Sequence, residues 1–409
     1  MTIDISSING QELEGKKILL CVTGSVSSME SPRIARELIK HGADVIPVLS
    51  HSASKLIGPE LLHWATGNET ITSLTGKMEH VKLANGDLDS VDLILVAPCT
   101  SNAIGKLAQG ISDDTISTIC TVALGSNVPI LIAPGMHEPM FENPILQNNI
   151  SLLKKNGVRF VSPIFEHNKA KMASFDDIFK EILNELFVQD LSGKNILITA
   201  GPTVEKIDPI RIITNKSSGK TGLYLANEAK RRGADVTLIY GEGTETPPIS
   251  IRTLRVSSFQ ELFDVTTSEL SNNNYDFYFA SAAPSDFRIV RPFDDKISSR
   301  SKSSLNLELE SYPKIINSIK QISPSTKLIA FKALYGNDSD SVSHAISEIF
   351  DDSNADFIIV NDVSRNDAGF SSDYNELTMF TRDDSFNFAY ASKKKLSKSI
   401  IDQILKILN

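Results

Sequence analysis

Residues 198–220 read ITAGPTVEKIDPIRIITNKSSGK, and the pattern around this stretch indicates the fold. An apolar run at 195–199 has strand length and leads into Gly201, while a second glycine, Gly219, precedes a helical pattern at 220–232. A strand that turns into a helix in this way directs backbone N–H groups and the helix N-terminus toward one crevice, which favours an anionic phosphate. We therefore expect this turn to bind a nucleotide or another phosphate ligand.

The segment between the two glycines is longer than a simple connection requires. Loops between strands and helices usually contain about 2–6 residues. This segment, with the residue that follows it, concentrates polar side chains that donate hydrogen bonds: Asn215, Lys216, Ser217, Ser218 and Lys220. We interpret it as catalytic as well as ligand-binding.

Strand and helix patterns alternate along the whole chain. In the first half, strands are expected at 16–24, 43–50, 91–97 and 129–133, and helices at 31–42, 102–124, 144–156 and 175–187. In the second half, further strands are expected at 235–240, 251–256, 275–281, 327–331 and 356–360, helices near 259–270, 313–322 and 341–350, and a hairpin of 377–381 with 386–391 before a final helix. No element is assigned to 284–304 or 361–375. The alternation predicts the α/β class, with two doubly wound, Rossmann-like domains whose sheets are largely parallel.

The domain boundary is expected near residue 188. Apolar periodicity lapses at 188–194 (VQDLSGK), and the pattern then restarts: GKNILITAG at 193–201 echoes GKKILLCVTG at 15–24, and RRGADVTLI at 231–239 echoes KHGADVIPV at 40–48. A chain of 409 residues suits two or three domains. We predict two domains of related architecture, 1–188 and 189–409.

Composition excludes several classes of protein. The net charge of −9 argues against sequence-independent nucleic-acid binding, which depends on clustered Lys and Arg. Three cysteines without a C-x-x-C motif indicate neither a disulfide scaffold nor a zinc site. The sequence has no signal-peptide pattern and no apolar run approaching the ~20 residues of a membrane helix. We expect a cytoplasmic protein with no nucleic-acid or membrane partner.

Four motifs in the first half match one family. Residues 97–103 (APCTSNA) alone are equally well explained as a helix N-cap, because Ser, Thr and Asn favour that position. Together with 78–84 (MEHVKLA), 106–118 (KLAQGISDDTIST) and 133–141 (APGMHEPMF), they resemble the flavin-dependent cysteine decarboxylases, the family of phosphopantothenoylcysteine decarboxylase and the lantibiotic decarboxylases. The resemblance implies a flavodoxin-like domain with FMN as the electron sink for decarboxylation.

The resemblance also implies roles for single residues. It places FMN contacts at Gly24, Ser25, Ser50, Thr100 and Asn102. It makes His80 the active-site histidine, whereas a lone histidine is otherwise more often structural. It assigns substrate binding to Met136, His137 and Met140, with His137 in place of the family's asparagine and Phe141 in place of its tryptophan.

The first half departs from the family in its flap. Bacterial members carry a cysteine there that protonates the intermediate, but the corresponding 165–173 (FEHNKAKMA) has none. The sequence is thus a variant of a non-bacterial type in which His167, Lys169 or Lys171 stands in for the cysteine, or in which the final step runs differently. An alternative is that the first half is a degenerate FMN-binding or structural module.

Motifs in the second half resemble phosphopantothenate–cysteine ligase, in order and over nearly its whole length. They are the stretch at 198–222, then ASAAPSDFR at 280–288, DDKI at 294–297, PKI at 313–315, AFKA at 330–333, VNDVS at 360–364 and GFSSDYNE at 369–376. The rival interpretation, a nicotinamide-dependent oxidoreductase, fits poorly because G-x-G-x-x-G is absent.

This second resemblance implies CTP as the activating nucleotide, with Mg²⁺ or Mn²⁺ held mainly by the triphosphate. It assigns turnover of the acyl intermediate to Asn215. With His80 and His137 from the first resemblance, Asn215 completes the catalytic candidates of the chain. The expected nucleotide and substrate contacts are Gly201, Ser217, Ser218, Gly219, Lys220, Ala280, Ala282, Asp286, Lys296, Phe331, Lys332, Asn361 and Asp362.

The basic residues of the second half differ from the bacterial pattern. The bacterial K-x-K-K is replaced by Lys296-Ile297-Ser298-Ser299, so Lys296, Arg300 or Lys302 is left to reach the triphosphate, and Lys332 adds a charge beside Phe331. We expect the positive charge of the nucleotide site to come from other positions than it does in the bacterial members.

Together the two resemblances imply a bifunctional enzyme of coenzyme A biosynthesis. Its substrates would be 4′-phosphopantothenate, L-cysteine and CTP, and the product of the second domain would be the substrate of the first. The families assemble decarboxylase trimers and ligase dimers, which implies a homo-oligomer, up to a dodecamer.

Overall fold

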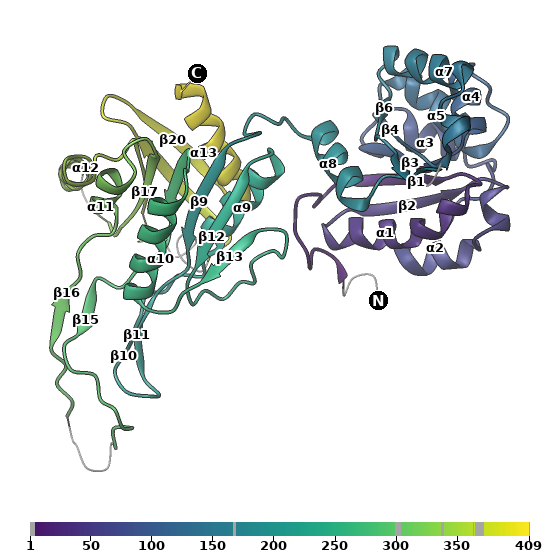
Figure 1. Ribbon diagram of the computed structural model, residues 1–409. Helices are drawn as coiled ribbons and strands as arrows, with labels where there is room; N and C mark the ends of the chain where they lie inside the picture. The colour runs from purple at the N-terminus through teal and green to yellow at the C-terminus, as the bar shows by residue number, and fades with distance from the viewer. Residues whose placement is uncertain are drawn as a thin grey trace. The chain divides into compact units, whose positions relative to one another are not determined.

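The computed structural model describes residues 5–166, 169–298, 304–336, 339–362, 364 and 372–408. The chain divides into two compact units, 1–188 and 189–409 (Figure 1). Each unit is built on a largely parallel sheet with helices on both faces, so the predicted α/β class with two doubly wound sheets is confirmed.

The first unit contains a five-stranded parallel sheet. Its strand order is β2 (Asp44–Leu49), β1 (Lys17–Val22), β3 (Leu93–Cys99), β4 (Ile130–Pro134) and β6 (Arg159–Phe160). The helices are α1 (Ser31–Lys40), α2 (Pro59–Thr66), α3 (Glu79–Ala84), α4 (Ser101–Ala108), α5 (Thr115–Ser126), α6 (Glu138–Phe141), α7 (Pro144–Lys155) and α8 (Phe175–Leu186), with short 3-10 turns at Val26–Glu30 and Ala53–Lys55.

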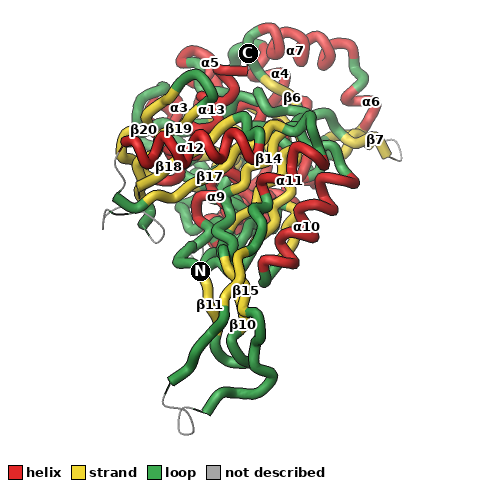
Figure 2. Tube along the Cα trace, turned by 90° about the vertical axis from the view of Figure 1, so that its left-hand side faces the viewer, coloured by secondary structure: helices red, strands yellow, loops and turns green. Residues whose placement is uncertain are grey.

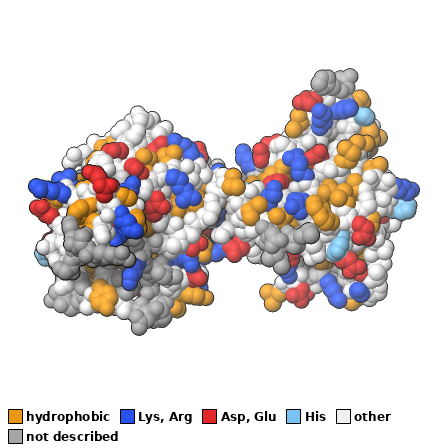
Figure 3. All heavy atoms as spheres, turned by 90° about the horizontal axis from the view of Figure 1, so that it is seen from below, with side chains coloured by type: hydrophobic (Ala, Val, Ile, Leu, Met, Phe, Trp, Pro, Cys, Tyr) orange, Lys and Arg blue, Asp and Glu red, His pale blue; other side chains and the backbone are white. Residues whose placement is uncertain are grey.

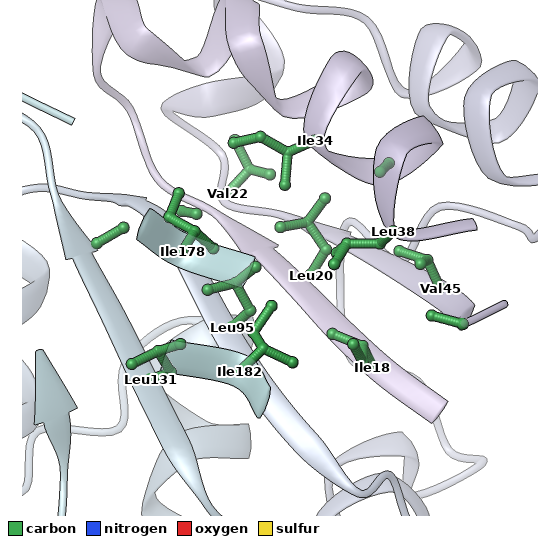
Figure 4. Close-up of a cluster of buried hydrophobic side chains, with 14 of the residues drawn as sticks. Ile18, Leu20, Val22, Ile34, Leu38, Val45, Leu95, Leu131, Ile178 and Ile182 are labelled. Atoms are coloured by element: carbon green, nitrogen blue, oxygen red, sulfur yellow. The ribbon is translucent and has the colours of Figure 1, made fainter. Parts of the chain in front are cut away.

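Alternate residues of each strand supply two separate cores. Leu20 and Val22 point toward α1 and α8, where they meet Ile34, Leu38 and Ile178 (Figure 4). The intervening strand residues pack on the opposite face against α4, α5 and α7. Because both faces are covered, the strands read as continuous apolar runs rather than as alternating ones.

The prediction of one helix at 102–124 is wrong, because α4 and α5 are separate. Gly110 adopts φ +67°, a left-handed conformation that ends a helix. Asp114 then caps α5, since its side chain accepts from the Ser117 amide at 2.9 Å while the Ser117 hydroxyl accepts from the Asp114 amide. The apolar residues on both sides of this break made the pattern look continuous.

A small antiparallel sheet in the first unit was not predicted. It has the order β5 (Met136–His137), β8 (Lys169–Lys171) and β7 (Ile164–Glu166). It brings residues that follow β4 beside a segment about thirty positions further along the chain. Strands of two and three residues are too short to leave a periodic pattern in the sequence.

The second unit contains an eight-stranded sheet in the order β13-β12-β9-β14-β17-β18-β19-β20. Its first six strands are parallel: β13 (Arg252–Arg255), β12 (Asp235–Tyr240), β9 (Asn195–Ala200), β14 (Phe277–Ala280), β17 (Lys327–Leu334) and β18 (Phe357–Asp362). The predicted hairpin, β19 (Tyr374–Phe380) with β20 (Ser385–Ser392), is confirmed and adds two antiparallel strands to one edge. The helices are α9 (Lys220–Arg231), α10 (Phe259–Asn272), α11 (Ile316–Ile322), α12 (Ser339–Ser353) and α13 (Lys393–Leu408).

Two antiparallel hairpins, here called the arms, extend beyond the carboxyl edge of this sheet (Figures 1 and 2). One is β10 (Val204–Lys206) with β11 (Ile212–Thr214), inserted between β9 and α9. The other is β15 (Phe287–Ile289) with β16 (Leu309–Ser311), which follows β14. The Phe293 amide donates to the Ile207 carbonyl at 2.8 Å, so the arms are joined to each other. The polar segment noted between Gly201 and Gly219 is therefore largely a hairpin.

Among the described residues, no helix is long and apolar enough to cross a membrane. The face in Figure 3 intersperses Lys and Arg with Asp and Glu, and its coloured atoms form no continuous basic stripe of the kind that nucleic acid would need.

Candidate functional site

A cavity of about 520 Å³ lies at the carboxyl edge of the second unit's sheet. It is bounded by the ends of β14 and β17, the first turn of α9 and the segment that follows β14. The cavity gathers most of the residues predicted for the ligase: Asn215, Ser217, Ser218, Gly219, Lys220, Ala280, Ala282, Asp286, Phe331, Lys332 and Asn361. Residues far apart in sequence thus share one wall, as the carboxyl edge of a doubly wound sheet requires.

The turn before α9 depends on a glycine. Gly219 is the N-cap of α9 and has φ +82°, and a β-carbon there would lie 2.8 Å from the hydroxyl oxygen of Tyr240. That hydroxyl donates to the Ser218 carbonyl at 3.1 Å and accepts from the Glu245 amide at 3.2 Å. The tyrosine therefore supports the turn from behind and leaves no room for a side chain at position 219.

Asn215 connects this turn to the strand beside it. Its side-chain nitrogen donates to the Ala283 carbonyl at 3.2 Å and to the Pro284 carbonyl at 2.9 Å. Both residues follow β14, where Ala280 and Ala282 line the cavity. The amide is thus held at the cavity wall at the place where the two loops meet.

Lys314 of the cavity and two carboxylates beside its Lys220 were given no role from the sequence. Lys220 forms an ion pair with Asp373 and lies 3.7 Å from Glu245, and the bond to Asp373 raises the pKa of Lys220. Lys314 lines the cavity and pairs with Asp286. The PKI motif at 313–315 pointed to Lys314, although no role was assigned to it.

Lys393 also lines the cavity, at the start of the last helix. Burial, followed by the charge of Lys220, lowers its pKa to about 8 despite the nearby Asp373. It belongs to a run of three lysines, 393–395, and nothing in the sequence distinguishes the buried one from its two neighbours.

Two predicted ligase residues do not line the cavity. Gly201 follows β9 with φ +82° and packs against the backbone of Gly241 and Gly243 instead. Lys296 is exposed in the segment between β15 and β16, and the alternatives Arg300 and Lys302 lie outside the described residues. The Asp362 side chain also lies outside them. The described part of the cavity thus draws its lysines from Lys220, Lys314, Lys332, Lys393 and Lys216 rather than from Lys296.

Asp208 organises the turn that joins β10 to β11. Its buried carboxylate accepts from the amides of Ile210 at 2.8 Å, Arg211 at 2.7 Å and Ile297 at 3.2 Å, and it pairs with the Arg211 guanidinium. Burial opposes ionisation of Asp208, but these hydrogen bonds outweigh it and lower its pKa to about 2. One carboxylate therefore ties the β10–β11 hairpin to the segment before β16.

In the first unit, hydrogen bonds join the loops that follow β1, β3 and β4. The Thr23 hydroxyl donates to the Pro98 carbonyl at 2.9 Å and accepts from the Thr100 amide at 2.9 Å. The Ser25 hydroxyl donates to the Gly135 carbonyl at 2.9 Å. The predicted FMN residues Gly24, Ser25, Thr100 and Asn102 consequently lie on adjoining loops, which we call the cradle.

The cradle also includes the loop after β2. The Ser50 hydroxyl accepts from the Ala53 amide at 3.1 Å, and a β-carbon at Gly24 would lie 2.5 Å from the Ser52 β-carbon. Thr100 caps α4 through the Ala103 amide at 3.3 Å, so the structural reading of 97–103 as an N-cap is correct in itself. The Thr100 hydroxyl caps α4 with one lone pair and keeps its second lone pair and its proton, so it can bind a ligand at the same time.

His80 lies on α3, which packs mainly against α5 rather than on the cradle. Its Nδ1 atom is buried, and so is the Ser28 hydroxyl of the turn after Ser25; neither has a hydrogen-bond partner among the described residues. A buried polar atom without a hydrogen bond lowers the free energy of unfolding by about 1–3 kcal/mol. The Ser28 hydroxyl, which lies in the turn after Ser25, fits a polar group that binds at the cradle.

The small antiparallel sheet joins the predicted substrate clamp to the predicted flap. His137 is opposite Lys169 and Met136 is opposite Ala170, so the side chains of each pair lie on one face. The Phe141 and Phe165 rings meet edge to face with centroids 5.6 Å apart, and Met140 is exposed on α6. Of the flap candidates, Lys171 pairs with Glu166 at 2.6 Å, and His167 lies outside the described residues.

Comparisons with known proteins cover both units. A family model described as Flavoprotein matches residues 6–187, and one described as DNA/pantothenate metabolism flavoprotein C-terminal domain matches residues 191–408. The Coenzyme A biosynthesis bifunctional protein CoaBC of Thermococcus kodakarensis is 40% identical over 99% of this chain and 98% of its own length. The protein of the same name in Methanocaldococcus jannaschii is 36% identical over 97% and 95%. A crystal structure of the C-terminal domain of a CoaBC protein is 30% identical, covers 53% of this chain and 97% of that one, and superimposes with a TM-score of 0.44.

Proposed function

This chain belongs to the family of CoaBC bifunctional proteins of coenzyme A biosynthesis, and from that premise we propose how its two units divide the work. It is an enzyme with phosphopantothenate–cysteine ligase and phosphopantothenoylcysteine decarboxylase activities. The ligase is assigned to residues 189–409 and the decarboxylase to residues 1–188. The product of the second unit is then the substrate of the first.

The observation that carries the ligase assignment is the cavity in which the glycine turn, Asn215 and several lysines converge. In the proposed reaction the carboxylate of 4′-phosphopantothenate attacks the α-phosphate of CTP, and pyrophosphate leaves. The amine of L-cysteine then attacks the acyl-cytidylate, and CMP leaves. Both steps place negative charge on oxygen, which the turn at 217–220 and the lysines would stabilise.

Asn215 is proposed to act on the acyl intermediate. Its amide already donates to two carbonyl oxygens, Ala283 and Pro284, at the cavity wall. Exchange of one of these bonds for a bond to the acyl oxygen would stabilise the developing oxyanion at the point of cysteine attack. Mg²⁺ or Mn²⁺ is proposed to be held mainly by the triphosphate, and the described residues include no cluster of three or more His, Cys, Asp or Glu suited to a metal.

FMN is proposed to bind the cradle through Gly24, Ser25, Ser50, Thr100 and Asn102. The bound flavin supplies the electron sink that loss of CO₂ from an unactivated carbon requires. His80 is proposed to hold or move a proton near the substrate thiol through its unsatisfied Nδ1 atom. Met136, His137 and Met140 are proposed to bind the substrate. Lys169, opposite His137, is the described flap residue best placed to replace the family's cysteine.

Two properties complete the proposal. The protein is proposed to act as a homo-oligomer of ligase dimers and decarboxylase trimers, up to a dodecamer. CTP is proposed over ATP on the basis of the ligase resemblance. The positive charge that binds its triphosphate is proposed to come from the lysines of the cavity instead of from Lys296.

The flavin and the nucleotide are tested on the purified protein. We expect a yellow protein with an FMN spectrum, and ligase turnover with CTP at least tenfold more efficient in kcat/KM than with ATP. A colourless protein that no added FMN restores, or equal turnover with ATP, would overturn the corresponding assignment. A flavin-loaded protein that accumulates phosphopantothenoylcysteine would instead identify a degenerate first unit.

A further inference from the structure

Lys393 carries a buried charge at the wall of the ligase cavity. Its side chain is 4% exposed, and it is the first residue of α13 (Figure 1). Its backbone N–H donates to the Asp373 carbonyl at 2.8 Å, while Leu396 and Ile400 of the same helix lie in the core. The ammonium is therefore presented to the cavity from the fixed end of a packed helix.

A second cation, Lys220, lines the same cavity from the first turn of α9. The two helices pack together on one face of the sheet. Among the described residues, the charged groups that act on Lys393 include Lys220 from α9 and Asp373 from the segment before β19. The Asp373 carboxylate thus lies within the field of both ammonium groups.

This arrangement favours an anionic ligand. Two ammonium groups that line one cavity give it a positive potential, which attracts an anion. The carboxylates near these lysines are solvent-exposed, with 62% of the Asp373 side chain and 39% of the Glu245 side chain accessible. Exposed ion pairs are weak. A phosphate that enters the cavity can therefore replace Asp373 as the partner of Lys220. From the same position it can contact the ammonium group of Lys393.

We propose that Lys393 and Lys220 together bind a phosphate group of a ligase substrate, with Lys393 as a binding residue that the sequence motifs do not assign. This inference rests on the proposed ligase function. The chemistry is shared by two sources, the triphosphate of the nucleotide and the phosphate of 4′-phosphopantothenate. Experiments on the full chain distinguish them.

The first test compares Lys393→Met with Lys398→Met. Both substitutions remove one lysine charge from α13, but Lys398 is exposed and does not line the cavity. We expect Lys393→Met to raise the KM of one phosphate-bearing substrate at least tenfold, with the KM of cysteine unchanged and with wild-type values for Lys398→Met. If the nucleotide KM rises, the triphosphate is the ligand. If the KM of phosphopantothenate rises, and the KM of unphosphorylated pantothenate is the same in Lys393→Met and the wild type, the pantothenate phosphate is the ligand. Unchanged KM values for both would overturn the inference.

A second measurement keeps a positive charge at this position by using the conservative variant Lys393→Arg. In the wild-type protein we expect kcat/KM for that substrate to fall above pH about 8, where Lys393 loses its proton, and Lys393→Arg to move the fall to higher pH. Identical pH profiles for the two proteins would contradict the role.

The third measurement is independent of catalysis. Binding of inorganic tripolyphosphate, followed by calorimetry, should weaken at least tenfold in Lys393→Met and not in Lys398→Met. Equal binding by the two variants would overturn the phosphate subsite even if the wild-type ligase is active. An inactive wild-type ligase that binds tripolyphosphate through Lys393 would instead overturn the proposed function and leave the subsite standing.

Discussion

The side-chain amide of Asn215 donates to the Pro284 carbonyl oxygen at 2.9 Å, across the cavity edge of the second unit. Asn215 lies before α9 and Pro284 lies after β14, so this bond fixes the glycine turn against the neighbouring strand end. The same side-chain nitrogen also donates to the Ala283 carbonyl at 3.2 Å. The donor is therefore already oriented at the cavity wall before a substrate arrives.

Asn215→Asp should stall the ligase after nucleotide activation. A carboxylate cannot donate to the two carbonyl oxygens, and it repels the oxyanion that forms when cysteine attacks. We expect coupling to slow at least a hundredfold, equivalent to about 2.7 kcal/mol, while pyrophosphate is still released. Mass spectrometry of the bound acyl-cytidylate measures the block, and normal coupling with cysteine would refute the role of Asn215.

Gly219→Ala should impair the ligase and leave the decarboxylase active. The left-handed conformation costs a non-glycine residue roughly 1–2 kcal/mol, and the added carbon would lie 2.8 Å from Tyr240. The turn must therefore move. We expect a lower Tm and a raised nucleotide KM, with decarboxylation of supplied phosphopantothenoylcysteine as the internal control. A nucleotide KM equal to that of the wild type would show that the turn does not bind phosphate.

His80→Asn should abolish release of CO₂ while the flavin stays bound. Asparagine keeps a polar group of similar reach but cannot titrate near neutral pH. His63→Asn is the matched control, since His63 is an exposed histidine of the same unit. Trapped CO₂ and the flavin absorbance are measured on the same samples. Unchanged decarboxylation would remove His80 from the mechanism.

Asp208→Asn should destabilise the β10–β11 turn and its contact with Ile297 in a pH-dependent way. The folded-state pKa of Asp208 is lowered to about 2, below the unfolded value near 3.9. The stabilisation is thus complete above about pH 4 and is lost as the pH falls toward 2. We expect the variant to have a lower Tm at pH 7 and the difference to shrink below pH 4. A constant difference across this range would assign the effect to something other than the carboxylate charge.

Lys393→Met should stabilise the protein even though it weakens substrate binding. The folded-state pKa of Lys393 is lowered from 10.5 to about 8, so the charged form is penalised in the folded protein. That penalty is fully present below pH 8 and fades between pH 8 and 10.5. Its upper limit is about 3 kcal/mol, from 1.36 kcal/mol per pKa unit. Denaturant unfolding at pH 7 and pH 10 measures the gain, and a destabilised variant at pH 7 would indicate a structural role for Lys393.

The sheets were predictable because their strands are long, apolar and buried on both faces. The run predicted at 235–240 has the same bounds as β12, and the predicted hairpin of 377–381 with 386–391 overlaps β19 and lies inside β20. The arms were not predictable, because Val204–Lys206 and Phe287–Ile289 are strands of only three residues, too short to leave a periodic pattern. The helix break between α4 and α5 was hidden for the opposite reason, since apolar residues continue on both sides of Gly110.

The cavity wall was predictable where its residues belong to the quoted motifs, as Asn215 and Phe331 do. Lys314 lies in the quoted PKI motif but was given no role, and Lys393 could not be assigned because only its burial distinguishes it from the two lysines that follow it. Lys296 was assigned from the ligase resemblance, whereas the structure places it in the exposed segment between β15 and β16, next to Ile297, whose amide donates to Asp208.

The most direct test of the account is product analysis on one sample of the purified protein. It is supplied with 4′-phosphopantothenate, L-cysteine, CTP and Mg²⁺, and the mixture is followed by mass spectrometry. The account predicts 4′-phosphopantetheine together with CMP, pyrophosphate and CO₂, after transient phosphopantothenoylcysteine. Accumulation of phosphopantothenoylcysteine without phosphopantetheine would contradict it.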